Sequence, residues 1–252
     1  MNINEILKKN INNNYVYTEE ERIEQLNHIT DSSTIYNVAM TLSDNNKLDD
    51  RVIKKLDSYY LMQLLKTIED VELVKKGLVY LEGNIACQVV NQDKYNSRTR
   101  LNLIEYINDK DSSTKESYRM YVVDTITDDA LLEESLKYFE SERYKTKIIK
   151  RISDDSIKLR LTQNLTEENN RYEVIKTMDS DSQIKNLEIL NLSDVHKKDI
   201  LTKSENGIYT YTEEERIERL NHITDSSTIY NVAITLSDNN KLDDRVIKKL
   251  DS

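Results

Sequence analysis

Short groups of apolar residues recur along the chain with helical spacing. Ile35, Val38, Ala39 and Leu42 occupy positions i, i+3, i+4 and i+7, the pattern of one face of an amphipathic helix. Four further groups have the same or a closely related spacing: Leu61, Leu64, Leu65 and Ile68; Tyr118, Tyr121, Val122 and Thr125; Tyr144, Ile148, Ile149 and Ile152; and Ile157, Leu161 and Leu165. Each group soon ends at a polar break, so the pattern predicts many short helices.

The breaks share one chemistry, because each is rich in Ser, Thr, Asp or Asn. They are Thr30–Ser33, Ser43–Asn46, Ile126–Asp129, Ser153–Ser156 and Asp179–Ser182. Such side chains accept hydrogen bonds from the free N–H groups at a helix start, so we expect each break to end one helix and cap the next. Thr18 and Glu21 have the spacing of a capping box. The groups begin about 11 to 18 residues apart, which predicts on the order of 16 short helices with brief connections.

A helix of this length is marginal alone in water and becomes stable when its neighbours cover its apolar face. The segment Lys147–Lys158 joins an apolar helix end, an Asp-rich turn and a new amphipathic helix. In this respect the chain resembles HEAT-like or armadillo-type helical repeat proteins. The resemblance implies an all-α fold, a right-handed α-solenoid of roughly 16 stacked helices, and a binding scaffold. The chain departs from that pattern in lacking proline and in having shorter units.

A long segment occurs twice. Residues 17–58 recur at 211–252 with two changes, Gln25 to Arg219 and Met40 to Ile234, at an offset of 194 residues (211 − 17). We therefore expect a flanking segment over residues 1–16, a helical repeat array over 17–210, and a continuation of the same array over 211–252.

Composition narrows the fold class. The 252 residues include no proline and three glycines, so the turn formers of sandwiches, barrels and hairpins are nearly absent. Apolar residues make up 37% and charged residues 33%, which favours a thin core shared between neighbouring helices over one deep core.

Charge and cysteine content bear on partners and compartment. The net charge of −10 disfavours nucleic acid and anionic membranes and favours a basic or extended protein partner. Cys87 is the one cysteine, the N-terminus lacks the apolar core of a signal peptide, and no apolar run is long enough for a membrane span. We expect a soluble cytoplasmic protein that does not bind membranes.

No pattern of catalytic residues is evident. His28 and His222 occupy the same position of the repeated segment, and neither they nor His196 suggest a nucleophile–base set. Cys87 lies in an apolar stretch and is expected to be a buried core residue. Asp109 and Asp111 mimic the start of a calcium-binding loop, but Thr114 and Met120 replace the glycine and glutamate that such a loop needs. The sequence thus predicts no enzyme, no cofactor and no metal, and helix capping explains the acidic turns.

Two groups of residues are candidates for binding. The first is a basic patch of five cations, which are Arg143, Lys145, Lys147, Lys150 and Arg151. It could contact an anion or a nucleic acid, or it could be a solvated helix face balanced by nearby carboxylates. The second consists of tyrosines at the edges of the apolar groups, namely Tyr36, Tyr59, Tyr60 and Tyr230. The 16 tyrosines supply nearly all the aromatic surface, and they suit interface hot spots or half-buried helix seams.

In the second copy of the repeat, the apolar residues Val246, Ile247 and Leu250 lack the helix that follows Ser58 in the first copy. This suggests head-to-tail self-association or a place in a longer array. The leading functional hypothesis is a non-enzymatic protein-binding scaffold. The alternative is a nucleic-acid-binding or regulatory helical-repeat protein that acts through the basic patch.

Overall fold

The computed structural model describes residues 3–43, 49–179 and 189–202, together with 182, 183, 186, 213–220 and a few positions between 223 and 248. In this part of the chain there are fifteen α-helices and no β-strand, and an isolated β-bridge joins Lys9 and Tyr15. The prediction of an all-α protein is therefore confirmed. The chain divides into two compact units, residues 1–127 and 128–252. The boundaries expected from the repeated segment, at residues 17 and 211, stay predictions.

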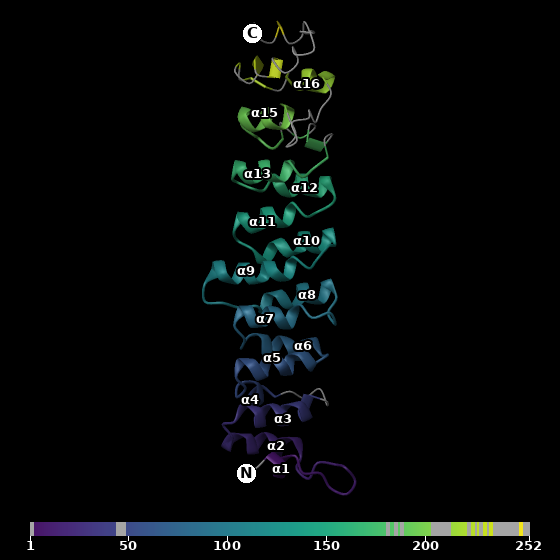
Figure 1. The fold of residues 1–252 in the computed structure, drawn as a ribbon, viewed down its shortest axis with the longest axis vertical. Coiled ribbons are helices and arrows are strands. Elements are labelled where there is room, and N and C mark those ends of the chain that lie inside the picture. Colours follow the sequence, from purple (N-terminus) through teal and green to yellow (C-terminus); the bar gives the residue numbers. More distant parts are fainter. Residues whose placement is uncertain are drawn as a thin grey trace. The chain divides into compact units, whose positions relative to one another are not determined.

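The first unit consists of short helices that follow one another in chain order (Figure 1). Its α-helices are α1 (Ile3–Ile6), α2 (Glu19–Gln25), α3 (Ser32–Ser43), α4 (Asp50–Ile53), α5 (Ser58–Thr67), α6 (Val71–Leu78), α7 (Gly83–Val90), α8 (Ser97–Leu103) and α9 (Ser112–Val123), and single 3-10 turns cover Leu26–His28 and Ile104–Tyr106. Within this unit α3 packs on α5, α5 on α7, and α7 on α9. Helices α3, α5, α7 and α9 thus form a row in which each helix contacts the next.

The second unit repeats this arrangement. It contains α10 (Asp129–Ser135), α11 (Glu142–Ile149), α12 (Asp155–Thr162), α13 (Glu168–Ile175), α15 (Asp194–Thr202) and α16 (Glu213–Arg219), with a 3-10 turn at Leu136–Tyr138. Helix α11 contacts α10 and α12, its neighbours in sequence, and also α13, the helix two places ahead. Helix α15 contacts α16.

Several helix starts are capped by acidic side chains, and two of these, Asp128 and Asp154, lie in the predicted polar breaks. The side chains of Asp57, Asp128 and Asp154 accept hydrogen bonds from backbone N–H groups in the first turns of α5, α10 and α12. At the start of α2, Thr18 and Glu21 form both hydrogen bonds of the predicted capping box. Each such bond satisfies a backbone donor that the helix itself leaves unpaired.

Four successive N-caps of the second unit follow a fixed period that the apolar pattern did not reveal. In the second unit the N-cap residues Asp128, Ser141, Asp154 and Glu167 lie 13 residues apart (141 − 128, 154 − 141 and 167 − 154). In the first unit, Asp57 and Asp70 have the same separation (70 − 57). From α10 to α13 one helix and its turn therefore occupy 13 residues, whereas the later N-caps of the first unit, Asp70, Glu82, Asn96 and Asp111, are 12, 14 and 15 residues apart (82 − 70, 96 − 82 and 111 − 96).

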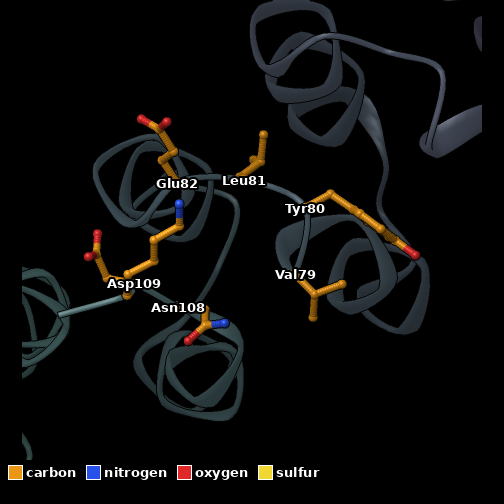
Figure 2. Close-up of a pocket in the computed structure, with 7 residues that line it drawn as sticks. Val79, Tyr80, Leu81, Glu82, Asn108 and Asp109 are labelled. Carbon is orange, nitrogen blue, oxygen red and sulfur yellow. The ribbon is translucent and has the colours of Figure 1, made fainter. Parts of the chain in front are cut away.

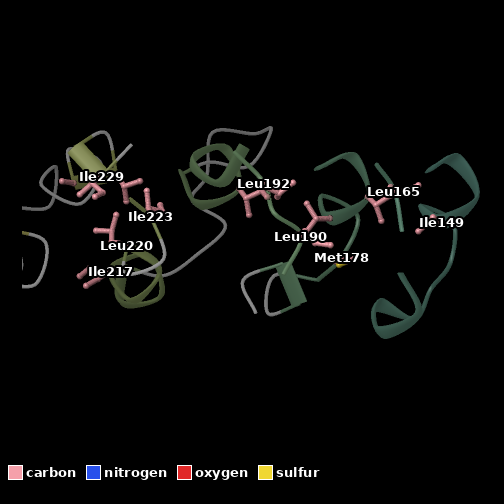
Figure 3. Packing of buried hydrophobic residues seen from close by; sticks show 14 residues of the cluster. Ile149, Leu165, Met178, Leu190, Leu192, Ile217, Leu220, Ile223 and Ile229 are labelled. Carbon is pink, nitrogen blue, oxygen red and sulfur yellow. The ribbon is translucent and has the colours of Figure 1, made fainter. Parts of the chain in front are cut away.

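Apolar faces of consecutive helices form a thin, continuous core. In the first unit the groups beginning at Ile35 and Leu61 are buried as predicted. In the second unit a single cluster of buried residues extends from Ile149 through Leu165 and Leu190 to Ile229 (Figure 3). The helices of the described residues are 4 to 12 residues long, a length that is marginal alone in water, so each depends on the helices packed against it.

The apolar face predicted for α9 is confirmed at Val122, which is buried, and is wrong at Tyr121 and Thr125. Tyr121 is exposed and so is Thr125, whereas Met120 and Val123 are buried. The buried face is rotated because α9 packs along α7, where Cys87 Sγ donates to the Tyr118 carbonyl oxygen at 3.2 Å. Tyr121 therefore points away from the core.

In α12 the most deeply buried side chains are polar. Lys158 and Thr162 are buried, while Ile157 and Leu161 of the predicted apolar face are only partly buried. The Lys158 ammonium donates to the Thr177 carbonyl at 2.9 Å and pairs with the Asp155 carboxylate at 3.2 Å. These partners compensate the cost of burying a charge. A prediction based on apolar spacing alone therefore did not place Lys158 on the buried face of α12.

Candidate functional site

Three of the four candidate tyrosines belong to the first unit, and the fold brings them together. Tyr36 lies on α3, and Tyr59 and Tyr60 lie in the first turn of α5. The ring centroids of Tyr36 and Tyr60 are 5.4 Å apart with an interplanar angle of 41°, and those of Tyr59 and Tyr60 are 5.2 Å apart at 82°. Both separations lie in the range preferred by aromatic pairs. We call this group, Tyr36, Tyr59 and Tyr60, the tyrosine surface.

The local sequence explains why these rings meet. Asp57 caps α5 by accepting a hydrogen bond from the Tyr60 N–H at 3.0 Å, which fixes the position of the first turn. Leu61, Leu64 and Leu65 are buried and hold the inner face of the helix in place. Tyr59 and Tyr60 precede this apolar face, and so they project at its edge toward α3 and solvent.

The tyrosine surface is open to solvent at Tyr59. Its side chain is 61% exposed, whereas Tyr36 and Tyr60 are partly buried. Tyr59 packs edge-on against the Tyr60 ring and leaves most of its surface to solvent. Large aromatic side chains that are partly exposed to solvent are enriched among the residues that contribute most to binding at protein interfaces.

Tyr230, the fourth candidate, occupies the position of Tyr36 in the second copy of the repeated segment. It lies in a helical stretch and is 58% exposed. Of the apolar residues expected to be uncovered in that copy, Ile247 is 42% exposed. Val246 and Leu250 lie outside the described residues.

The basic patch lies on α11 and the turn that follows it. Arg143 and Lys147 are exposed and one helical turn apart, while Lys145, Lys150 and Arg151 are partly buried. Lys150 pairs with the Glu173 carboxylate at 2.9 Å, and the Lys147 ammonium lies 5.5 Å from the centre of the Tyr144 ring. The carboxylate of Glu173 reduces the local positive potential at Lys150, and binding through the patch stays a prediction.

A pocket that the sequence did not suggest lies in the first unit (Figure 2). The turn after α6, Val79–Glu82, lines one side, and Asn108–Lys110, before α9, lines the other, around a volume of about 430 Å³. Val79 and Tyr80 are partly exposed at its edge. Its apolar and charged groups do not converge on one point, so it resembles a surface hollow more than an enclosed ligand site.

The loop that mimics a calcium site caps a helix instead. Asp111 Oδ2 accepts a hydrogen bond from the Thr114 N–H at 2.6 Å at the start of α9, and Asp109 Oδ1 accepts one from the Asp111 N–H at 3.1 Å. Hydrogen bonding from Thr114 lowers the pKa of Asp111. Across the described residues, no three His, Cys, Asp or Glu side chains are placed to hold a metal ion.

Carboxylates in the second unit connect alternate helices. Asp129 accepts hydrogen bonds from the Ser153 and Asp154 N–H groups, and Glu142 accepts them from the N–H groups of Thr166 and Glu167. Two further bonds continue the series: Asp155 accepts from the Asp179 N–H at 2.8 Å, and Glu168 accepts from the Ser193 N–H at 2.8 Å. We call Asp129, Glu142, Asp155 and Glu168 the acid ladder. The 13-residue spacing of these four acids is the sequence signal that would have revealed it.

The pKa values of two ladder acids, Glu142 and Glu168, are lowered. Burial acts to raise the pKa of Glu142, but hydrogen bonds from Thr166, Glu167 and Asn170 outweigh it and lower the pKa to about 2. Hydrogen bonds from Ser193 and His196 lower the pKa of Glu168 to about 2. Glu142 and Glu168 therefore act as hydrogen-bond acceptors for the turns, and a lowered pKa is the reverse of what a general acid needs.

One group superficially resembles a catalytic triad. His196 Nδ1 lies 2.5 Å from Glu168 Oε1 and 3.4 Å from Ser193 Oγ, and its ring stacks on Tyr172 with centroids 4.0 Å apart. A triad needs the nucleophile and the acid on opposite ring nitrogens, whereas here both contact Nδ1. The histidine therefore joins α15 to α13 and does not activate Ser193.

Cys87 is a core residue, as expected. Its side chain is buried, and burial raises the pKa of its thiol to about 12. A thiol with such a pKa is a poor nucleophile at neutral pH.

The described helices were compared with the requirements for crossing a membrane. Among the described residues, no helix combines the length and the apolar character that crossing a bilayer requires.

Comparisons with protein-family models, with characterised proteins and with solved structures found no match to this chain.

Proposed function

We propose that this protein is a non-enzymatic binding scaffold, built as a HEAT-like α-solenoid, that contacts a protein partner through the tyrosine surface. The observation that carries the proposal is the convergence of Tyr36, Tyr59 and Tyr60 at the contact of α3 and α5, with the Tyr59 ring 61% exposed. Clustered aromatic residues of this kind form the energetic centre of many interfaces.

The solenoid part of the proposal is supported by two features found within the units. Helices two places apart pack on each other, as α3, α5 and α7 do in the first unit and α11 and α13 do in the second. The 13-residue period of the N-caps means that successive helices repeat the same local geometry. A regular repeat that is stabilised by contacts between neighbours is characteristic of a solenoid and of the extended binding surfaces that solenoids present.

The partner is proposed to carry a basic, extended segment. The protein has a net charge of −10, which attracts cationic chains over long distances and speeds their association. At the surface itself, the face of a tyrosine ring binds lysine or arginine through a cation–π interaction worth about 0.5–1 kcal/mol at exposed sites. The same preference is evident within the chain, where Arg22 lies 4.2 Å from the centre of the Tyr15 ring.

The proposal is tested by affinity capture from native lysate with the whole chain immobilised. Wild type is compared with Tyr59→Ala and with Tyr121→Ala, a matched control whose ring is 60% exposed in the same unit. We expect a protein partner that resists nuclease treatment, is recovered equally by wild type and Tyr121→Ala, and falls at least about fivefold with Tyr59→Ala, the loss expected for a hot-spot residue. Equal recovery by all three proteins would refute the proposed surface.

The alternative, binding of nucleic acid through the basic patch, is favoured by the exposure of Arg143 and Lys147 on α11. Two results would favour this alternative over the scaffold. Nuclease treatment would abolish recovery of the partner, and the chain would bind DNA or RNA with a salt-sensitive affinity that is lost on charge reversal at Lys147 and Lys150. The ion pair of Lys150 with Glu173 and the overall charge of −10 make it the weaker candidate.

A further inference from the structure

Helices α5, α7 and α9 lie parallel in the first unit. The Lys94 ammonium, just after α7, donates to the Lys66 carbonyl in the last turn of α5 at 3.0 Å. The Asn91 amide, at the end of α7, donates to the Tyr121 carbonyl in the last turn of α9 at 3.4 Å. Because these helices also pack along one another, their starts lie together on the opposite edge. Tyr59, in the first turn of α5, therefore shares an edge with the pocket whose walls precede α7 and α9.

Apolar side chains gather on this edge. Tyr59 is 61% exposed, and Val79 and Tyr80, in the turn that leads into α7, are 49% and 44% exposed. Val79 and Tyr80 line the pocket together with Leu81 (Figure 2). Exposed aromatic and apolar side chains in neighbouring turns are a feature of protein-binding surfaces. The pocket is therefore a second place, one helix along the row from Tyr59, where a partner chain finds apolar surface.

The pocket carries more negative than positive charge. Its charged residues are Glu82, Asp109 and Lys110, so two carboxylates lie against one ammonium group. Glu82 is the N-cap residue of α7, but its exposed side chain makes no capping hydrogen bond, which leaves its carboxylate available to a partner. The N-cap residues of α5 and α9 on the same edge, Asp57 and Asp111, are acidic as well. The edge is thus complementary to a cationic segment.

We propose that the pocket binds an arginine side chain of the same extended segment that contacts Tyr59. A guanidinium group is planar, so it stacks on an aromatic ring such as that of Tyr80 and pairs with a carboxylate such as that of Glu82. Lysine offers a compact charge without the planar face, and it fits a hollow of this chemistry less well. The inference rests on the proposed scaffold function and adds a second anchor to the tyrosine surface.

The fold also sets the spacing of the two anchors in the partner. Packed helices lie about 8–10 Å apart, so the pocket between the starts of α7 and α9 is about 10–15 Å from Tyr59. An extended chain advances about 3.3 Å per residue, which places the arginine about three to five residues from the residue that contacts Tyr59.

Two fluorescent peptides of identical composition test this spacing. In the spaced peptide, three glycine or serine residues separate two arginines, and in the adjacent peptide the arginines are neighbours. Fluorescence anisotropy with the full chain should show that the spaced peptide binds about two- to fivefold more tightly, because it alone reaches Tyr59 and the pocket together. A third peptide, with glutamates in place of the arginines, should not bind. Equal affinities of the spaced and adjacent peptides, or binding of the acidic peptide, would overturn the proposal.

Glu82→Gln removes a carboxylate that neither caps α7 nor lies in the core, so circular dichroism should show an unchanged fold. It should weaken binding of the spaced peptide about two- to fivefold, the contribution of an exposed ion pair. Glu24→Gln, an exposed glutamate of α2 in the same unit, is the matched control and should leave the affinity unchanged. The proposal is overturned if Glu82→Gln binds the spaced peptide as well as wild type does. It is also overturned if Glu24→Gln weakens binding equally, since net charge alone would then account for the effect.

Tyr59→Ala separates this inference from the proposed function. If Tyr59→Ala weakens binding of the spaced peptide and Glu82→Gln does not, the tyrosine surface stands and the pocket is not an anchor. If Glu82→Gln weakens binding and Tyr59→Ala does not, the tyrosine surface fails, and with it the shared segment, although the pocket itself binds arginine. Weaker binding with both variants is the expected result.

Discussion

Glu142 and Thr166 join two helices that are not adjacent in sequence. One carboxylate oxygen of Glu142, in the first turn of α11, accepts hydrogen bonds from both the N–H of Thr166 at 2.6 Å and its hydroxyl at 2.7 Å, just before α13. The other oxygen accepts one from the Glu167 N–H at 3.1 Å. The Glu142 side chain thereby satisfies the backbone N–H groups of Thr166 and Glu167 in the turn before α13. It also links α11 to α13 and so helps to fix the spacing of these two helices.

Replacing Glu142 should therefore destabilise the second unit. Glu142→Gln retains the shape but removes the charge that strengthens four hydrogen bonds, from the Thr166 N–H and hydroxyl, the Glu167 N–H and the Asn170 amide, and we expect a loss of about 1–2 kcal/mol in the free energy of unfolding. Urea denaturation followed by circular dichroism measures it. Glu24→Gln, an exposed glutamate of α2, is the control and should change stability by less than about 0.5 kcal/mol. Equal stability of the two variants would show that the ladder is not a stabilising element.

Stability should also depend on pH through the ladder. The pKa values of Glu142 and Glu168 lie at about 2 in the folded protein and at the ordinary value of 4.5 when the chain is unfolded. Because the folded values are lower, the unfolded state binds these protons first as the pH falls. The stabilisation is complete above about pH 4.5 and is lost as the pH drops toward about 2.

The measurement is the urea midpoint between pH 5 and pH 2. It should fall more steeply for wild type than for the double variant Glu142→Gln, Glu168→Gln, in which two of the responsible groups no longer titrate. Parallel curves for the two proteins would contradict the assignment of these low pKa values. Both side chains are partly exposed, so the difference in slope is expected to shrink in high salt.

The sequence predicted part of this structure for a clear reason. Apolar spacing identified the inward faces that begin at Ile35 and Leu61, and the Asp-rich breaks identified the caps, because both signals are local. The ladder was missed because a hydrogen bond between Glu142 and Thr166 links residues 24 apart and has no local signature. The site shows the same limit. Tyr36, Tyr59 and Tyr60 could be proposed one by one, but that they touch depends on the packing of α3 on α5.

The inward position of Lys158 provides a second stability test. Lys158→Ala removes the donor to the Thr177 carbonyl and the partner of Asp155, and we expect it to cost about 2–4 kcal/mol, as breaking a buried pair does. Lys158→Met retains the aliphatic stem and should be less destabilising, because the packing of the side chain is preserved. Thermal or urea unfolding of the two variants separates the packing of Lys158 from its charge. If both variants matched wild type, the ammonium group would have no role in holding α12 to the turn after α13.

The last prediction concerns Gly83 and Tyr118. A methyl group on Gly83, the first residue of α7, would overlap the ring of Tyr118 from α9, which lies directly against the glycine backbone. Gly83→Ala should therefore destabilise the first unit by about 1–3 kcal/mol, because the ring must leave its position in a packed contact. The loss of stability arises from overlap with the Tyr118 ring alone, so it should disappear when that ring is removed.

A double-mutant cycle isolates the contact. In a Tyr118→Ala background, Gly83→Ala should be neutral or slightly stabilising, since alanine favours the helix over glycine by about 1 kcal/mol. Urea unfolding of the two single variants, the double variant and wild type gives the coupling energy, which should be at least about 1 kcal/mol. A coupling near zero would mean that α7 and α9 are not in contact through this pair. The packing of α7 on α9 in the first unit would then have to depend on other residues.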